Sequence, residues 1–251
     1  EGSTPFRFSL HVGDVGHTLI VGPTGAGKSV LLALMALQFR RYPRAQVFAF
    51  DFGGSIRACA LAMQGDWHDL GGELTDAADA SVSLQPLARI HQTSERAWAA
   101  DWIVAILMRE NIQITPDVKE HIWTALTSLA SAPVGERTIT GLAVLLQSND
   151  LKQALRPYCV GGPYGRLLDA ESEHLGSADV QAFEIEGLVG TGAAPAVLSY
   201  LFHRIGDRLG GQPTLLIIDE GWLALDDEGF ADQLREWLKT LRKKNASVIF
   251  A

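Results

Sequence analysis

The chain has 251 residues, of which 47% are hydrophobic and 20% charged, and its formal net charge is -8 at pH 7. This composition is typical of a folded globular protein that can bury a full core, as one large domain with an insertion or as two small domains. The acidic balance gives no bulk support to nonspecific nucleic-acid binding, and the longest apolar stretch, residues 30–39, is too short to cross a bilayer. The only cysteines are Cys59 and Cys159, without CxxC spacing, so the sequence indicates neither a zinc site nor a disulfide framework, and a reducing compartment is expected.

The first predicted elements are short strands at residues 6–10 and 17–22, followed by GPTGAGKS and then a helix at residues 29–41. The GxxxxGKS pattern is typical of a phosphate-binding loop, because its glycines allow a tight turn that aims backbone N–H groups at phosphate oxygens. Lys28 would add charge at the β and γ phosphates, and Ser29 would offer its hydroxyl to Mg²⁺. The nucleotide-binding residues expected from this motif are Gly22, Pro23, Thr24, Gly25, Ala26, Gly27, Lys28, Ser29 and Val30.

The middle of the chain changes from a mixed pattern to a helical one. A strand is expected at residues 46–52 and a helix at residues 56–63, followed by a stretch rich in Gly and Asp. Beyond it, apolar residues recur at helical spacing, as in SERAWAADWIVAILMRE and PDVKEHIWTALTSLA. We therefore predict three segments: the first part of a nucleotide-binding core at residues 1–93, an inserted helical subdomain at 94–158 and the second part of the core at 159–251.

The last third of the chain alternates strands with helices. Strands are expected at residues 181–188, 214–220 and 246–251, separated by helices at 193–210 and 230–244. This alternation predicts an α/β fold of the P-loop NTPase kind, a mostly parallel sheet with helices on both faces. In such a sheet, ligand sites form at the carboxyl ends of the strands, so the phosphate site is expected there.

The predicted strand LLIIDE ends in two carboxylates, Asp219 and Glu220. By itself this pattern is explained equally well by a functional acid pair and by a buried strand that ends in two solvated acids. Beside a phosphate-binding loop it favours a nucleotide hydrolase, in which Asp219 would hold Mg²⁺ together with Ser29. Glu220 could orient and deprotonate the attacking water, so it is the candidate catalytic base.

Three other nucleotide-binding classes can be weighed against the spacing of the motifs. LGGQ at residues 209–212 resembles part of the signature of ABC-class ATPases, but it lies two residues before the acid-pair strand, where that class has a helix between them. Gly210 and Gly211 are better explained as a helix end and a turn. The sequence contains no NKxD motif, which disfavours a GTPase. A small-molecule kinase remains an open alternative.

Two arginines are candidates for stabilising charge on a nucleotide. Arg242 lies in the LRKK segment at the end of the last predicted helix, where cations also complement the helix dipole. The functional alternative is an arginine finger that acts on the nucleotide of a neighbouring subunit. Arg166, in the glycine-rich GGPYGRLLD, is the second candidate, and a plain loop arginine is the alternative there.

A series of segments resembles the type IV secretion and conjugative-transfer ATPases, specifically the C-terminal motor domain of the TrbE kind. The resemblance covers nearly the whole chain, with the segments in the order of that family. They are GPTGAGKS, FDFGGS, LQPL, GGPYGRLLD, FEIEGL, IIDEGW and LRKKNASVIFA. The first and the sixth are common to many nucleotide hydrolases, whereas the series as a whole is more specific.

The resemblance implies a RecA-like core, ATP as substrate with Mg²⁺, and work at the cytoplasmic face of the bacterial inner membrane. There the protein would energise pilus assembly or passage of substrate through the secretion channel. By position, Lys28, Asp219 and Glu220 would serve ATP hydrolysis, and Arg242 would act between subunits. The implied partners are other secretion components and further copies of the chain in a hexamer, with membrane association through parts outside this chain.

Two departures from the family pattern stand out. Phe52 occupies a position where a basic residue is expected, and the sequence given stops at Ala251, before an expected Thr-Gln pair. The family's N-terminal domain is also expected outside this sequence. Two alternatives to the secretion motor stay open: a DNA-translocating ATPase, which the acidic balance disfavours, and a scaffold that binds nucleotide with negligible turnover.

Overall fold

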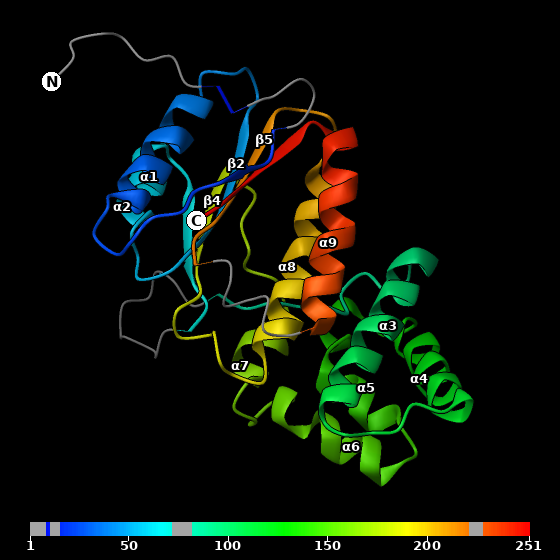
Figure 1. Ribbon diagram of the computed structural model, residues 1–251. Coiled ribbons are helices and arrows are strands. Elements are labelled where there is room, and N and C mark those ends of the chain that lie inside the picture. Colours follow the sequence, from blue (N-terminus) through cyan, green and yellow to red (C-terminus); the bar gives the residue numbers. More distant parts are fainter. Residues whose placement is uncertain (1–8, 11–15, 72–81, 221–227) are drawn as a thin grey trace, which may run out of the picture. The chain divides into compact units, whose positions relative to one another are not determined.

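The computed structural model describes residues 9–10, 16–71, 82–220 and 228–251. The chain forms two compact units, each assembled from segments that are distant in the sequence (Figure 1). The first unit combines residues 1–71, 177–189 and 204–251, and the second combines residues 72–176 and 190–203. Within the described ranges, no helix is both long enough and apolar enough to cross a membrane.

The first unit is built on a parallel sheet whose strand order, among the described residues, is β1-β6-β5-β2-β4-β3. Every residue of β2, β4 and β5 is buried, as expected for parallel strands with both faces covered. The strands are β1 (Thr18–Leu19), β2 (Gln46–Asp51), β3 (Asp66–Asp69), β4 (Val180–Glu184), β5 (Thr214–Ile218) and β6 (Ala246–Phe250).

Most of the predicted strands are present, and one observed strand was not predicted. The strand expected at residues 17–22 is reduced to β1, and the one expected at 6–10 falls largely outside the described residues. The additional strand, β3, has the sequence DWHD, which lacks the apolar run or alternation that marks a strand. Its pairing with β4, from Asp66 opposite Gln181 to Asp69 opposite Glu184, joins segments far apart in the sequence.

Helices cover both faces of the sheet in the first unit. Figure 1 shows α1 (Lys28–Phe39) and α2 (Arg57–Ala62) on one face and α9 (Glu228–Leu241) on the other. The buried side of α1 packs with residues of β2 and β5 in a continuous apolar core. This core includes Leu32, Phe39, Val47, Leu215 and Ile217. The arrangement confirms the predicted α/β fold with a parallel sheet between helical layers.

The second unit is mainly helical. Side-chain caps begin three of its helices: Thr115 accepts a hydrogen bond from Val118 N, Thr138 from Gly141 N and Ser148 from Leu151 N. Its helices are α3 (Thr93–Arg109), α4 (Pro116–Leu129), α5 (Ile139–Leu145), α6 (Asn149–Leu155) and α7 (Gly165–Leu168). The start of α8 (Ala194–Arg208) belongs to this unit, and Trp102 Nε1 donates a hydrogen bond to Ala196 O at 2.9 Å. The predicted helical range 94–158 lies inside the second unit, which also holds residues 72–93, 159–176 and 190–203.

A buried carboxylate organises the GGPYGRLLD segment of the second unit. Asp169 is 5% exposed and accepts hydrogen bonds from Thr140 N at 3.0 Å, from Val160 N at 2.7 Å and from the Thr140 hydroxyl. Three donors on one carboxylate offset the cost of burying its charge. This segment is therefore a tightly bonded turn of the second unit, and Arg166 lies exposed on α7 within it.

Candidate nucleotide site

The glycine-rich loop between β1 and α1 has the backbone of an anion-binding turn. Gly25 and Gly27 have φ angles of 81° and 86°, in the left-handed region that side chains with a Cβ rarely adopt. Gly27 is the N-cap of α1, and Lys28 is the first residue of the helix. The loop therefore leads into a helix N-terminus, where backbone N–H groups and the helix dipole favour phosphate oxygens.

Two residues of the loop are held by defined contacts. Lys28 Nζ donates a hydrogen bond to Gly22 O at 3.0 Å, so the ammonium group lies against its own loop. Ser29 Oγ donates to Asp219 Oδ2 at 3.4 Å. The fold thus brings together a hydroxyl and a carboxylate that lie 190 residues apart in the sequence. Both are hard oxygen donors of the type that Mg²⁺ prefers.

The acid pair follows β5 at the carboxyl edge of the sheet. Asp219 is 4% exposed, and its backbone N–H donates to Phe50 O of the neighbouring strand β2 at 2.9 Å. Glu220 has a φ of 50°, and its N–H donates to Asp219 Oδ1 at 3.1 Å. Glu220 therefore has a left-handed backbone directly after the strand, which is uncommon for a residue with a Cβ.

The charge environment of Asp219 suits a cation. Burial raises the pKa of this carboxyl, and the nearby charges of Asp51 and Glu220 raise the pKa further, against hydrogen bonds from Glu220 N and Ser29 that lower it. Acidic groups gathered around a buried carboxyl disfavour its ionised form. A divalent cation bound between Ser29 and Asp219 would offset this repulsion, so the residues present fit the predicted Mg²⁺ site.

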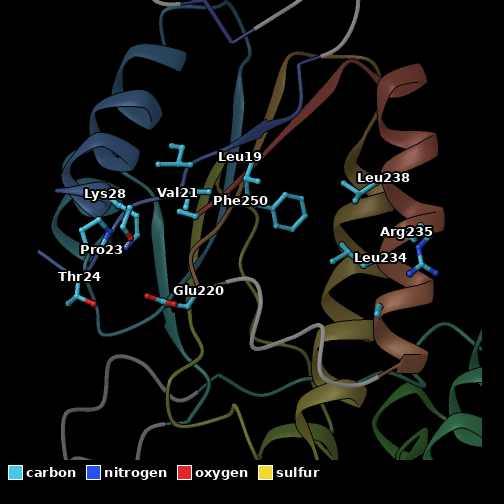
Figure 2. Close-up of a pocket in the computed structure, with 14 residues that line it drawn as sticks. Leu19, Val21, Pro23, Thr24, Lys28, Glu220, Leu234, Arg235, Leu238 and Phe250 are labelled. Carbon is cyan, nitrogen blue, oxygen red and sulfur yellow. Dashed lines mark hydrogen bonds between the residues drawn. The ribbon is translucent and has the colours of Figure 1, made fainter. Parts of the chain in front are cut away.

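A cavity of about 670 Å³ in the first unit is lined by the loop, by Glu220 of the acid pair and by α9 (Figure 2). Its volume is in the range of small-molecule binding sites. At one end lie Thr24, Lys28 and Glu220, and at the other an apolar wall continues to the side of α9. The apolar lining includes Leu19, Val21, Leu234, Leu238 and Phe250.

Two buried acids beside the site had no predicted role. Glu184, 7% exposed at the end of β4, accepts hydrogen bonds from Gly53 N at 3.1 Å, from Gly54 N and from Glu186 N at 2.9 Å. Asp51, fully buried at the end of β2, accepts from the Ser55 hydroxyl and from Ile56 N at 2.8 Å. Together they fix the loop at residues 52–55, and the position of each acid at a strand end was the available signal.

The remaining predicted residues lie in different places. Val30, in the first turn of α1, is 75% exposed. Arg242 begins the short 3-10 turn Arg242–Lys244, and its side chain falls outside the described residues. In the same turn, Lys244 Nζ donates a hydrogen bond to Gly206 O at 3.2 Å, near the end of α8. Arg166 belongs to the second unit.

No protein-family model matches the chain, but individual proteins do. It is 47% identical over 254 residues to the conjugal transfer protein TrbE of Rhizobium radiobacter, and 46% identical over 253 residues to a probable conjugal transfer protein TrbE of Sinorhizobium fredii. Both alignments cover 100% of this chain but only 31% and 38% of those proteins. The chain therefore spans about a third of the length of the curated relatives that it matches.

A solved structure supports the fold. VirB4 of Thermoanaerobacter pseudethanolicus superimposes with a TM-score of 0.70 at 18% sequence identity, covering 96% of this chain and 70% of that one. The type IV secretion protein virB4 of Bartonella henselae is 26% identical over 258 residues. The parallel sheet, the phosphate loop and the helices on both faces form the expected RecA-like α/β fold. Over its whole length, the chain belongs to the TrbE and VirB4 family of conjugal transfer and type IV secretion proteins.

Proposed function

We propose that this chain is the ATP-hydrolysing motor part of a type IV secretion or conjugative-transfer machine. The observation that carries the proposal is the shared cavity, which is lined by Lys28 of the phosphate loop and by Glu220 of the acid pair. The Ser29–Asp219 contact lies beside it and offers two oxygen ligands for a cation. Membership of the TrbE and VirB4 family supports the setting in which this chemistry would be used.

Each residue has a role in the proposed reaction. The N–H groups of the loop and the Lys28 ammonium would hold the β and γ phosphates, while Ser29 and Asp219 would hold Mg²⁺. The cation would supply positive charge to the β and γ phosphates. Glu220 would orient a water and accept its proton as the water oxygen bonds to the γ phosphorus. The bond between that phosphorus and the leaving oxygen of ADP breaks, so the products are ADP and phosphate.

The proposal extends to the assembly in which the motor works. We place it at the cytoplasmic face of the bacterial inner membrane, in contact with other secretion components and with further copies of itself, a hexamer by family resemblance. Arg242 would then serve a nucleotide bound by the neighbouring copy, as an arginine finger. The energy of hydrolysis would drive pilus assembly or substrate passage. A DNA-translocating motor is the second candidate, and DNA-stimulated turnover would favour it.

The test compares ATP turnover and ATP binding in the full chain and three variants. Glu220→Gln should retain binding and lower turnover by about 10²- to 10⁴-fold, the usual contribution of a general base. Lys28→Ala should lower both. Glu186→Gln, an exposed carboxyl after β4, is the matched control and should turn over ATP like the unmodified protein. Equal turnover in all four proteins would reject the proposal, and tight binding without turnover would favour a nucleotide-gated scaffold.

A further inference from the structure

Three acidic residues lie in a row across the carboxyl edge of the sheet. In the parallel pairing of β2 with β5, Phe50 lies opposite Ile218. The residues that follow these two are Asp51 and Asp219, and the N–H of Asp219 still donates to Phe50 O. On its other side, Asp51 lies opposite Glu184 of β4. We name Asp219, Asp51 and Glu184 the acid row.

The acid row lies on the face of the sheet that α1 covers. Side chains of a strand alternate between its two faces, so Asp51 and Asp219 share a face with the residues two and four positions before them. Those residues belong to the core that packs against α1, and they are Val47, Ala49, Leu215 and Ile217. The contacts agree, because Asp219 accepts a hydrogen bond from Ser29 of α1, and Asp51 accepts one from Ile56 N at the start of α2. Figure 1 shows both helices on this face.

The protein meets the charges of the row only with neutral groups. Glu184 accepts three backbone N–H bonds, and Asp51 accepts two hydrogen bonds, from the Ser55 hydroxyl and from Ile56 N. Asp51 is fully buried, and within the ranges that the structure describes no ion pair reaches it. A buried carboxylate with only neutral donors keeps its full negative charge, which attracts a cation to the space around it.

This charge acts on the candidate cation site. The carboxyls of Asp51 and Asp219 are close enough to interact through their charges. Both oxygens of Asp51 already accept hydrogen bonds, Oδ1 from Ser55 and Oδ2 from Ile56, so its effect on a cation beside Asp219 is electrostatic and needs no direct bond. Coulomb attraction grows with the product of the charges, so an added acid favours a divalent cation more than a monovalent one.

We propose that Asp51 is an electrostatic determinant of the nucleotide site, whose buried charge raises the affinity of the Ser29 and Asp219 pair for Mg²⁺. The same charge repels the phosphates of a nucleotide when no cation is present. Asp51 therefore makes nucleotide binding depend more strongly on Mg²⁺, and the two ligands bind cooperatively. The inference rests on the proposed function for the cation site itself, and it adds a residue that acts without ligating the metal.

Asp51→Asn tests the charge at nearly constant shape, because an amide can still accept from Ile56 N and donate to the Ser55 hydroxyl. Calorimetric titration of the full chain with ADP, once in EDTA and once in saturating Mg²⁺, gives the factor by which Mg²⁺ tightens ADP binding. This factor should fall about tenfold or more in Asp51→Asn. In EDTA the variant should bind ADP as tightly as the unmodified chain, or more tightly. Loss of ADP affinity in EDTA would indicate a structural role and overturn the inference.

Two variants at the exposed Ser55 separate charge from hydrogen bonding. Ser55→Ala removes a hydrogen bond from Asp51 but not its charge, and should leave the Mg²⁺ factor within about twofold. Ser55→Lys keeps Asp51 and places a cation beside it, so it should lower the factor as Asp51→Asn does. Circular dichroism melts check that each variant is folded, and Ser55→Lys carries the test if Asp51→Asn is not. An equal fall in Ser55→Ala would assign the effect to the structure of the loop and overturn the inference.

Asp219→Ala distinguishes failure of the inference from failure of the proposed function. It removes the expected ligand, so the Mg²⁺ dependence of ADP binding beyond that of ADP itself should disappear. If Asp219→Ala loses this dependence while Asp51→Asn and Ser55→Lys keep it, the role of Asp51 is rejected and the cation site stands. If Asp219→Ala retains the dependence of the unmodified chain, the cation site of the proposed function is rejected, and the role of Asp51 with it.

Discussion

Two glycine-rich loops lie at the carboxyl edge of the sheet and use their glycines differently. They are residues 22–29, after β1, and residues 52–55, after β2. Gly27 and Gly54 both have positive φ, at 86° and 68°. Within the described part of the chain, the N–H of Gly27 makes no hydrogen bond to the protein. The N–H of Gly54 donates to the buried carboxylate of Glu184. One loop leaves donors for a ligand, and the other satisfies them internally.

The difference shows why glycine content alone does not identify an anion site. Both loops have turns that only glycine adopts easily, and both follow parallel strands. A carboxylate already occupies the donors of the second loop, and its charge would repel a phosphate. The phosphate loop instead contains Lys28 and leads into the N-terminus of α1. The group that accepts hydrogen bonds from the backbone N–H groups therefore decides the role of each loop. In the second loop it is a protein carboxylate, and in the first it would be a phosphate.

Removing the internal acceptor of the second loop should have the largest effect. Glu184→Ala leaves the donors of Gly53, Gly54 and Glu186 without their partner, and we expect the free energy of unfolding to fall by about 2 to 5 kcal/mol. Chemical denaturation measures this loss. Lys28→Ala is the contrasting change in the first loop and should alter nucleotide-free stability by less than about 1 kcal/mol. Similar losses in the two variants would show that the loops do not differ in the way proposed.

Matched glycine replacements should separate the loops by a smaller amount. A Cβ on Gly27 meets nothing within 4 Å, and one on Gly54 meets only Glu184 Oε2 at 3.8 Å, so each Ala tests the backbone conformation itself. The left-handed conformation costs Ala about 1 to 2 kcal/mol. Gly27 is exposed and can relax without ligand, so Gly27→Ala should weaken nucleotide binding by about 5- to 30-fold.

Gly54→Ala cannot relax in the same way, because Glu184 holds its N–H. The cost of the left-handed conformation at this position should lower the free energy of unfolding. Nucleotide affinity should stay within about twofold of that of the unmodified protein. Calorimetric titration with nucleotide and denaturation of the same samples give both quantities. A loss of affinity in Gly54→Ala equal to that in Gly27→Ala would contradict the division of roles between the loops.

The comparison also explains which parts of the site could be predicted from the sequence. Ser29 and Asp219 were paired in advance because each belongs to a short motif with its own chemistry, so their separation did not matter. Glu184 belongs to no such motif. Its contact with Gly53 joins residues 131 positions apart, and nothing local in FEIEGL shows which donors its carboxylate accepts.

The same reasoning applies to the fold. Strands β2, β5 and β6 were predicted because buried parallel strands form apolar runs that can be read locally. Strand β3 was missed because its sequence, DWHD, is mostly polar and its strand conformation is fixed by pairing with β4. Helices α3 and α4 of the second unit followed from apolar spacing, whereas α7 lies in the glycine-rich segment where no helix was predicted. The buried Asp169 network joins residues that no periodicity connects.

The smallest expected effect concerns the carboxyl of Asp219, which lies beside the phosphate loop. Burial and the charges of Asp51 and Glu220 raise the pKa of Asp219. A carboxyl whose pKa is higher in the folded than in the unfolded state favours folding in its protonated form. This contribution is fully present below the unfolded pKa and is lost as pH rises through the folded pKa. Above the unfolded pKa, the Asp219 carboxyl therefore lowers the stability of the nucleotide-free protein.

Asp219→Asn should raise the thermal unfolding midpoint at neutral pH, and the gain should shrink as the pH falls below the pKa of Asp219. The same variant should lose the added stabilisation by Mg²⁺ and nucleotide, because it lacks the carboxylate that would hold the cation. Asp101→Asn, at an exposed position of α3, is the control and should show neither change. A gain that is equal at all pH values would contradict the argument. A gain confined to higher pH would mean that the carboxylates beside the phosphate loop repel one another until a ligand binds. In the loop held by Glu184, by contrast, the protein itself supplies the partner.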